Sequence, residues 1–136
     1  MLNPGAYTLL EMPLTAANNA VAMSSITDLE GMQAVTLEAQ LGYGSGGTTC
    51  KVWVQTTLDN GQTWIDIACF AFGAAGGIKV VNLSGMTPVT TAFAPSDGAL
   101  ADNTFIDGVL GTALRAKITS TGTYASSGVA VRACAR

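Results

Sequence analysis

Residues 50–72 read CKVWVQTTLDNGQTWIDIACFAF, and this stretch decides the fold class. Apolar and polar side chains alternate on both sides of the Asn60-Gly61 dipeptide, and a period of two is typical of β-strands. Asn-Gly between two alternating arms is the strongest short signal for a β-hairpin, since both turn residues must adopt positive φ. The stretch therefore predicts a hairpin with arms at Cys50–Thr57 and Trp64–Phe72.

The register of this hairpin follows from which side chains share a face. The apolar residues of both arms share a face if a two-residue turn pairs Thr57 with Trp64, or if a four-residue loop joins the arms. Either register leaves Trp53 and Asp66 on the outer face. The predicted inner face then contains Cys50, Val52, Val54, Ile65, Ile67 and Cys69.

Turn-forming clusters such as GYGSGG (42–47) and GAAGG (73–77) separate further alternating runs. We expect strands near Tyr7–Met12, Gln33–Tyr43, Ile78–Leu83, Val89–Phe93, Ala113–Ser120 and Gly128–Ala133. Many short strands at this spacing predict an all-β domain, an antiparallel β-sandwich or jelly roll. Residues 15–32 have no clear period, and a helical turn is an open alternative there.

The domain organisation expected from this pattern is a sandwich over residues 33–136 preceded by an extended arm over residues 1–32. The arm would reach a neighbouring molecule, because it is the least strand-like part of the chain. Deletion of Met1–Thr15 is then expected to abolish binding to a partner and to leave a folded domain.

The later strands also predict which basic residues point outward. Leu114, Ala116 and Ile118 alternate with Arg115 and Lys117, and Val129 and Val131 alternate with Arg132. Because side chains alternate across a strand, the basic residues should share the outer surface. They form either a solvated face or a docking surface for an acidic partner in another subunit.

The composition favours a protein that works inside an assembly. Hydrophobic residues make up 49% of the 136 residues and charged residues 11%, against roughly 25% in an average soluble domain. The mean hydropathy is +0.38. The apolar runs are too short to span a bilayer, and the first residues lack a basic region and include Glu11, so we expect neither a membrane protein nor a secretory signal. A homo-oligomer that assembles in the cytoplasm is expected instead.

Charge and histidine content exclude further classes. The net charge is −3, with only six Lys and Arg, which argues against a nucleic-acid partner. The chain has no histidine, so every Ser/His or Cys/His nucleophile pair is absent. For a hydrolase, Asp59 with Asp66, or Glu38 with Asp66, would be the carboxylate pairs to consider, but no spacing specifies either. We therefore expect no enzyme activity and no cofactor.

The turn residues at 57–64 fit the pattern [S/T]-x-D-x-G-x-[S/T]-W, which resembles the Asp-box of sialidases and other glycan-processing propellers. In those proteins the Asp-box is a repeated fold element away from the active site. Asp59 is expected to accept hydrogen bonds from the turn backbone, Gly61 to adopt positive φ, and Trp64 to cover the turn. The motif predicts a structural hairpin formed by Asp59, Asn60, Gly61, Thr63 and Trp64.

The three cysteines leave two possibilities open. Cys50 and Cys69, on the same predicted face, are either two buried thiols or a disulfide that forms in an oxidising environment. Cys134 shares the outer face with Arg132 and could pair with a neighbouring subunit. No cysteine spacing matches a zinc site.

The segment Pro95–Gly108 is the longest irregular stretch and carries Asp97, Asp102 and Asp107. Its spacing does not match an EF-hand loop, so we expect no metal there. Long ordered loops are often functional, so the segment is a candidate subunit contact.

Two stretches, TTCKVWVQTTLDNGQTWIDIACFAF and LADNTFIDGVLGTALRAKITSTGTYASSGVAVR, together resemble small structural proteins of tailed bacteriophages and prophages. The resemblance covers residues 33–136 and rests on Asp59, Gly61, Thr63, Trp64, Asp66, Arg115, Lys117 and Gly122-Thr123-Tyr124. It implies a virion β-sandwich, a capsid decoration (cement) protein bound to the major capsid protein, or a tail or head–tail component. A carbohydrate-binding module is the alternative, and it would present Trp53, Trp64 and Tyr124 on one face.

Overall fold

The computed structural model describes residues 4–136 and contains β-strands and no helix over that range. The strands are β1 (Gly5–Leu14), β2 (Asn18–Ala22), β3 (Ala34–Gly42), β4 (Ser45–Gly46), β5 (Thr49–Thr57), β6 (Ile65–Phe72), β7 (Gly77–Ser84), β8 (Ala113–Thr121), β9 (Tyr124–Ala125) and β10 (Ser127–Ala135). The predicted all-β fold is confirmed. The alternative of a helical turn in residues 15–32 is wrong.

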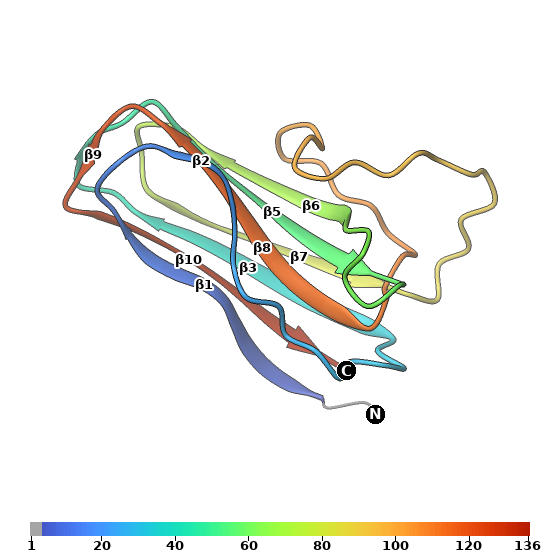
Figure 1. Ribbon diagram of the computed structural model, residues 1–136. Helices are drawn as coiled ribbons and strands as arrows, with labels where there is room; N and C mark the ends of the chain where they lie inside the picture. Colours follow the sequence, from blue (N-terminus) through green and yellow to red (C-terminus); the bar gives the residue numbers. More distant parts are fainter. Residues whose placement is uncertain (1–3) are drawn as a thin grey trace.

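Two four-stranded antiparallel sheets pack face to face (Figure 1). One has the order β1-β10-β3-β7 and the other the order β2-β8-β5-β6, while β4 and β9 form a short ribbon at one end. The predicted inward residues of β3, β8 and β10 are buried between the sheets: Val35, Leu37, Ala39, Leu41, Leu114, Ala116, Ile118, Val129 and Val131. Alternation along these strands therefore correctly identified the core.

The N-terminal segment is part of the sandwich, and the prediction of a separate arm is wrong for the residues that the structure describes. β1 pairs with β10 along its whole length, and β2 pairs with β8 in the other sheet. A β-bulge between Thr8 and Leu10 turns both Leu9 and Leu10 into the core. That bulge interrupts the period of two, which explains why the sequence pattern was weak. Residues 1–3 of the predicted arm lie outside the described residues.

The β5–β6 hairpin has the predicted register near its turn and a different one beyond it. Gln55 pairs with Asp66, as a two-residue turn would require, but a bulge follows, and Val54 pairs with Ala68. Beyond the bulge Cys69 pairs with Trp53, and paired residues share a face. Cys69 therefore points outward, away from the core face that holds Cys50, and its predicted inward position is wrong.

No strand forms at Val89–Phe93, which corrects a further prediction. Residues 85–112 form a long irregular connection between β7 and β8 that projects beyond the sandwich (Figure 1). Pro88 and Pro95 bracket the predicted strand, and proline removes the N–H that a sheet ladder requires. Only Phe105, later in the loop, forms a bridge with a sheet strand, at Ala68 on the edge of β6.

No helix in the described part of the chain is long and apolar enough to cross a membrane.

Candidate functional site

The Asp-box residues form a hydrogen-bonded turn between β5 and β6. The N–H of Thr63 and the hydroxyl of Thr57 both donate to Asp59 Oδ1, at 2.8 and 2.9 Å, and the N–H of Gly61 donates to Thr57 Oγ1 at 2.9 Å. The hydrogen bond from the Thr63 N–H contributes most to holding the pKa of Asp59 below its ordinary value. Asn60 and Gly61 have φ angles of 57° and 89°. The structural roles predicted for Asp59 and Gly61 are confirmed.

Trp64 connects this turn to β8. A Cβ atom at Gly61 would lie 3.6 Å from the Trp64 ring, so the ring covers the turn as predicted. Arg115 is a residue of β8, and its guanidinium lies 4.3 Å from the centroid of the Trp64 ring in a cation–π contact. The Nε–H of Arg115 also donates to Gln55 Oε1 at 2.7 Å. The half-buried indole is therefore held between the turn and the sheet.

Asp66 is the anchor of the long loop over the outer face of β5 and β6. Its side chain points outward, as predicted, yet the residue is 0% exposed because the loop covers it. Its carboxylate accepts hydrogen bonds from Gln55 Nε2 (2.8 Å), from Ser96 Oγ (2.9 Å) and from three consecutive backbone N–H groups at residues 98–100. Such a set compensates a buried carboxylate for its lost hydration.

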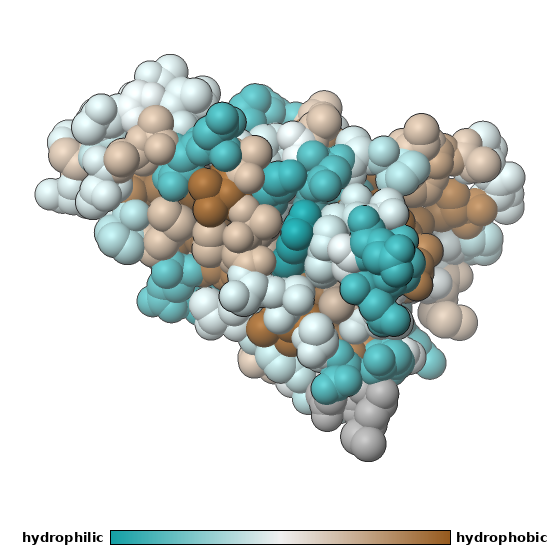
Figure 2. Space-filling model, viewed as in Figure 1, coloured by the Kyte–Doolittle hydropathy of each residue, from teal (hydrophilic) through white to brown (hydrophobic). Residues whose placement is uncertain are grey.

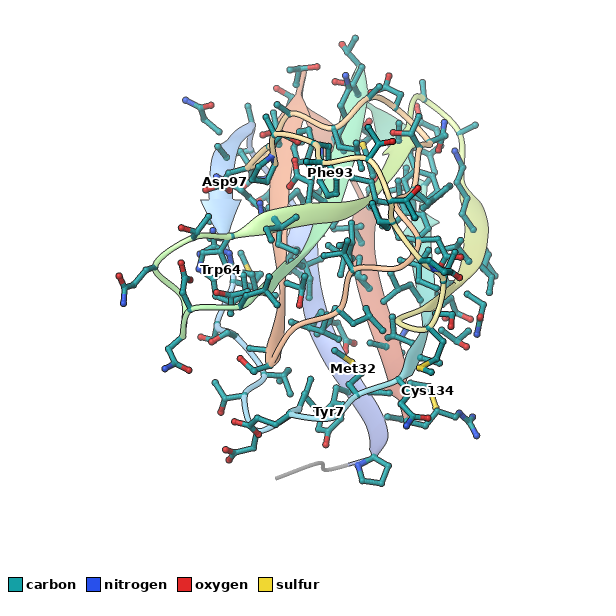
Figure 3. The ribbon with its side chains drawn as sticks, turned by 90° about the vertical axis from the view of Figure 1, so that its right-hand side faces the viewer. Tyr7, Met32, Trp64, Phe93, Asp97 and Cys134 are labelled. Atoms are coloured by element: carbon teal, nitrogen blue, oxygen red, sulfur yellow. The ribbon has the colours of Figure 1, made fainter. Side chains whose placement is uncertain are left out.

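Asp97, on the same loop, neutralises the basic residues of β8. Its Oδ1 lies 2.9 Å from Lys117 Nζ and 3.5 Å from Arg115 Nη2, and accepts from Gln55 Nε2 at 2.6 Å. Burial acts to raise the pKa of Asp97, but the hydrogen bonds from Lys117 and Gln55 and the two positive charges outweigh it, and the pKa is lowered. Figure 3 shows Asp97 and Trp64 on the same side of the molecule.

The basic residues predicted as a docking surface thus have partners within the chain. The side chains of Arg115 and Lys117 are only 17% and 15% exposed. Arg132 lies on the outer face of the other sheet, 3.7 Å from Glu11 and 3.9 Å from Glu38. The three residues do not share one outer surface, and contact with another subunit stays a prediction for them.

The aromatic face expected of a carbohydrate-binding module is absent from the described residues. Trp53 is buried under the loop, where its Nε1–H donates to the carbonyl of Leu100 at 3.0 Å. Tyr124 is a buried residue of β9, and its hydroxyl donates to the carbonyl of Gly73 at 2.9 Å. Of the three aromatic residues, Trp64 alone is half-exposed.

Neither hydrolase carboxylate pair forms. Glu38 and Asp66 lie on the outer faces of opposite sheets, so the sandwich separates them. Asp66 has its oxygens occupied by the loop and is not available to pair with Asp59.

The three loop aspartates also bind separate partners. Asp102 lies 2.9 Å from Lys51 Nζ, while Asp107 accepts from the N–H of Ser84 and the hydroxyl of Thr87. Within residues 4–136, no group of three or more Cys, Asp or Glu side chains is placed to hold a metal ion.

All three cysteines are free thiols, so the disulfide alternative for Cys50 and Cys69 is wrong. The two face opposite sides of their sheet and are both buried, and burial raises the pKa of Cys50 to about 11 and also raises that of Cys69. Cys134 lies half-buried on the outer face of β10, with an Arg136 nitrogen 3.5 Å from its sulfur.

Two separate sets of large apolar side chains remain exposed, one on the long loop and one on β7 in the other sheet. Residues 86–95 (the apolar loop) are all exposed, and they include Met86, Val89 and Phe93. On the outer face of the edge strand β7, Ile78 and Val80 are 60% and 63% exposed. Figure 2 shows hydrophobic surface at the right-hand side, where the loop projects in Figure 1. Exposed apolar side chains of this size make each set a candidate interaction surface.

Sequence reasoning missed Gln55 and Ser96 as members of the loop anchor. Gln55 sits at an outward position of β5 next to Asp66, in a chain with few charged residues. The available signal was the pairing of two polar residues, Gln55 and Asp66, on an otherwise apolar hairpin. The identity of the covering loop had no local signal, because Ser96 lies 30 residues from Asp66.

No protein-family model, no curated protein and no solved structure matches the chain. The resemblance to phage structural proteins therefore rests on the motifs of the chain itself.

Proposed function

We propose that this protein is a structural component of a bacteriophage virion, a homo-oligomeric decoration protein that binds the major capsid protein and stabilises the head lattice. The protein would reside in the virion after assembly in the bacterial cytoplasm, and we assign it no reaction and no cofactor. A tail or head–tail position is the second form of the same proposal.

The observation that supports this proposal most is the exposed apolar surface. An isolated soluble domain rarely leaves Met86, Val89 and Phe93 all exposed on one loop. Ile78 and Val80 are exposed as well, on the outer face of the edge strand β7. Burial of such side chains against another chain releases roughly 25 cal/mol per Å² of apolar surface. A symmetric assembly would supply that burial with one type of subunit.

The anchored loop supports the proposal in a second way. Asp66 and Asp97 attach residues 96–100 firmly to the sheet, directly after the exposed residues 86–95. A binding segment supported by a rigid scaffold loses less conformational entropy when it meets its partner.

The oligomeric part of the proposal is tested by sedimentation of the purified chain. We expect the wild-type chain to sediment as an oligomer and the Val80→Asp, Phe93→Asp double variant to sediment as a monomer. The matched control is Thr91→Asp, which adds a charge at an exposed polar position of the same loop. A monomer at all concentrations would exclude self-association.

The virion part is tested on particles purified from the encoding strain. We expect the chain in the particles by mass spectrometry and antibody label on the head. Label on the tail would select the tail form, and absence of the chain from purified particles would overturn the proposal.

A further inference from the structure

A small pocket lies between the Asp-box turn and the chain that leads from β2 to β3. Its volume is about 180 Å³, and its walls come from residues 25–30, from the turn at 57–64 and from the start of β8. This volume is below the roughly 300–1,000 Å³ of pockets for drug-sized ligands, so the pocket suits one ring of a small polar molecule. The lining includes Ser25, Thr27, Asp28, Glu30, Asn60 and Trp64.

Trp64 supplies the apolar wall of this pocket. Its position is defined by Gly61 on the turn and by Arg115, whose guanidinium stacks 4.3 Å from the ring centroid. The ring is half-exposed, while the other tryptophan, Trp53, is buried under the loop. A rigid, part-exposed indole beside polar groups is suited to a ligand with one apolar and one hydroxylated side.

The fold leaves several polar groups of the lining unused. Within residues 4–136, the hydroxyls of Ser25 and Thr27, the amide of Asn60 and the indole N–H of Trp64 make no hydrogen bond to protein atoms. The neighbouring anchor differs, because there Gln55, Ser96 and Asp97 are all paired. Ser25, Thr27 and Asn60 are exposed residues of the pocket lining, so their polar groups can be reached by a ligand.

The charged residues of the lining limit the chemical class of the ligand further. The carboxylates of Asp28 and Glu30 line the pocket, and no Lys or Arg does so among the residues that the structure describes. A ligand carboxylate would therefore find no Lys or Arg side chain in the lining with which to form an ion pair. Neutral ligand hydroxyls need no such ion pair and can exchange hydrogen bonds with the Asn60 amide and with the hydroxyls of Ser25 and Thr27.

From these contacts we infer that the pocket binds a single ring of a neutral saccharide, stacked on Trp64 and hydrogen-bonded to Asn60, Ser25 and Thr27. An acidic sugar such as sialic acid would gain no ion pair with a Lys or Arg of the lining. This inference goes beyond the assembly role, and it does not use the apolar loop or any contact between subunits.

The test is a ligand titration of the full chain in which binding is detected by changes in NMR chemical shifts. The neutral ligands are glucose, galactose, mannose and N-acetylglucosamine. Sialic acid is the acidic sugar, and the methyl ester of lysine is the cation probe. We expect at least one neutral sugar to bind in the millimolar range typical of so small a ligand and to shift the signals of Trp64 and Asn60. We expect no binding of sialic acid.

Two variants check the position of the site. Trp64→Ala removes the stacking wall, and Asn60→Gly combined with Ser25→Ala removes polar groups while retaining the positive φ of the turn; each should weaken binding by about tenfold or more. Thr90→Ala is the control, a hydroxyl removed outside the pocket. A folded Asn60→Gly, Ser25→Ala protein keeps the test valid if Trp64→Ala does not fold.

Three results would overturn the inference: no neutral sugar binds, binding is equal in the pocket variants, or only the lysine ester binds, in which case the pocket receives a cationic side chain. None of these results bears on oligomer formation or on the presence of the chain in particles, so the two proposals fail separately.

Discussion

The backbone N–H of Gly98 donates to both carboxylate oxygens of Asp66, at 2.9 Å to Oδ1 and 2.8 Å to Oδ2. The contact joins an edge strand to a loop 32 residues later in the chain. We expect Asp66→Ala to leave buried backbone donors unpaired and to lower the free energy of unfolding by about 3 kcal/mol. Urea denaturation measures this. The control is Asp102→Ala, whose exposed ion pair with Lys51 should contribute at most about 1 kcal/mol; equal losses in the two variants would contradict the anchor role.

β1 is an edge strand whose side chains are part of the hydrophobic core, so deletion of residues 1–15 should unfold the protein instead of releasing an arm. Leu9, Leu10 and Leu14 would all leave the core. Leu10→Ala alone should cost about 3 kcal/mol, whereas Val80→Ala, on an exposed position, should change stability by less than about 0.5 kcal/mol. Circular dichroism of the deletion and urea denaturation of the two variants check this, and a folded deletion protein would contradict it.

Asp97 should make the loop sensitive to acid. Its folded-state pKa lies below the ordinary 3.8, so its stabilising contribution is present above that pH and is lost as the pH falls through the lowered value. Asp97→Asn should be less stable than the wild type at neutral pH, with the difference shrinking in strong acid. Because Asp97 is half-exposed, the difference will be small. Thermal unfolding of both proteins over a pH series measures it; a difference independent of pH would contradict the assignment.

Any side chain at Gly61 should lower the stability of the Asp-box turn. Its φ is 89°, so Gly61→Ala should destabilise the protein by about 1–2 kcal/mol through backbone strain. Gly73→Ala is the matched control, because a Cβ there meets only ordinary contact, 3.8 Å from the carbonyl of Thr48, without positive φ. Equal thermal stability of the two variants would show that the turn tolerates a side chain.

Thiol reactivity should distinguish the three cysteines. The pKa of Cys50, about 11, keeps the thiolate scarce at neutral pH, and both Cys50 and Cys69 are buried. We expect iodoacetamide to modify Cys134 first in the folded protein and all three only after denaturation. Intact mass spectrometry measures the number of adducts, and Cys134→Ala should eliminate labelling of the native state. Rapid labelling of that variant would contradict the burial of the other two thiols.

The sequence by itself determined the all-β class, the inward faces of β3, β8 and β10 and the Asp-box turn. Each of these follows from local properties: side chains alternate along any strand, and Asn60-Gly61 supplies the positive φ angles that the turn requires.

Only the tertiary structure decided the rest. The bulge between Val54 and Gln55 reverses the face of Cys69, and the residues of the two strands do not predict it. Asp66 and Trp53 point outward as the alternation predicts, but they are buried because a loop folds over them that is 30 residues from Asp66 and 47 residues from Trp53 in the sequence. Alternation tells which side of a sheet a residue faces, while burial depends on what distant segment covers that side.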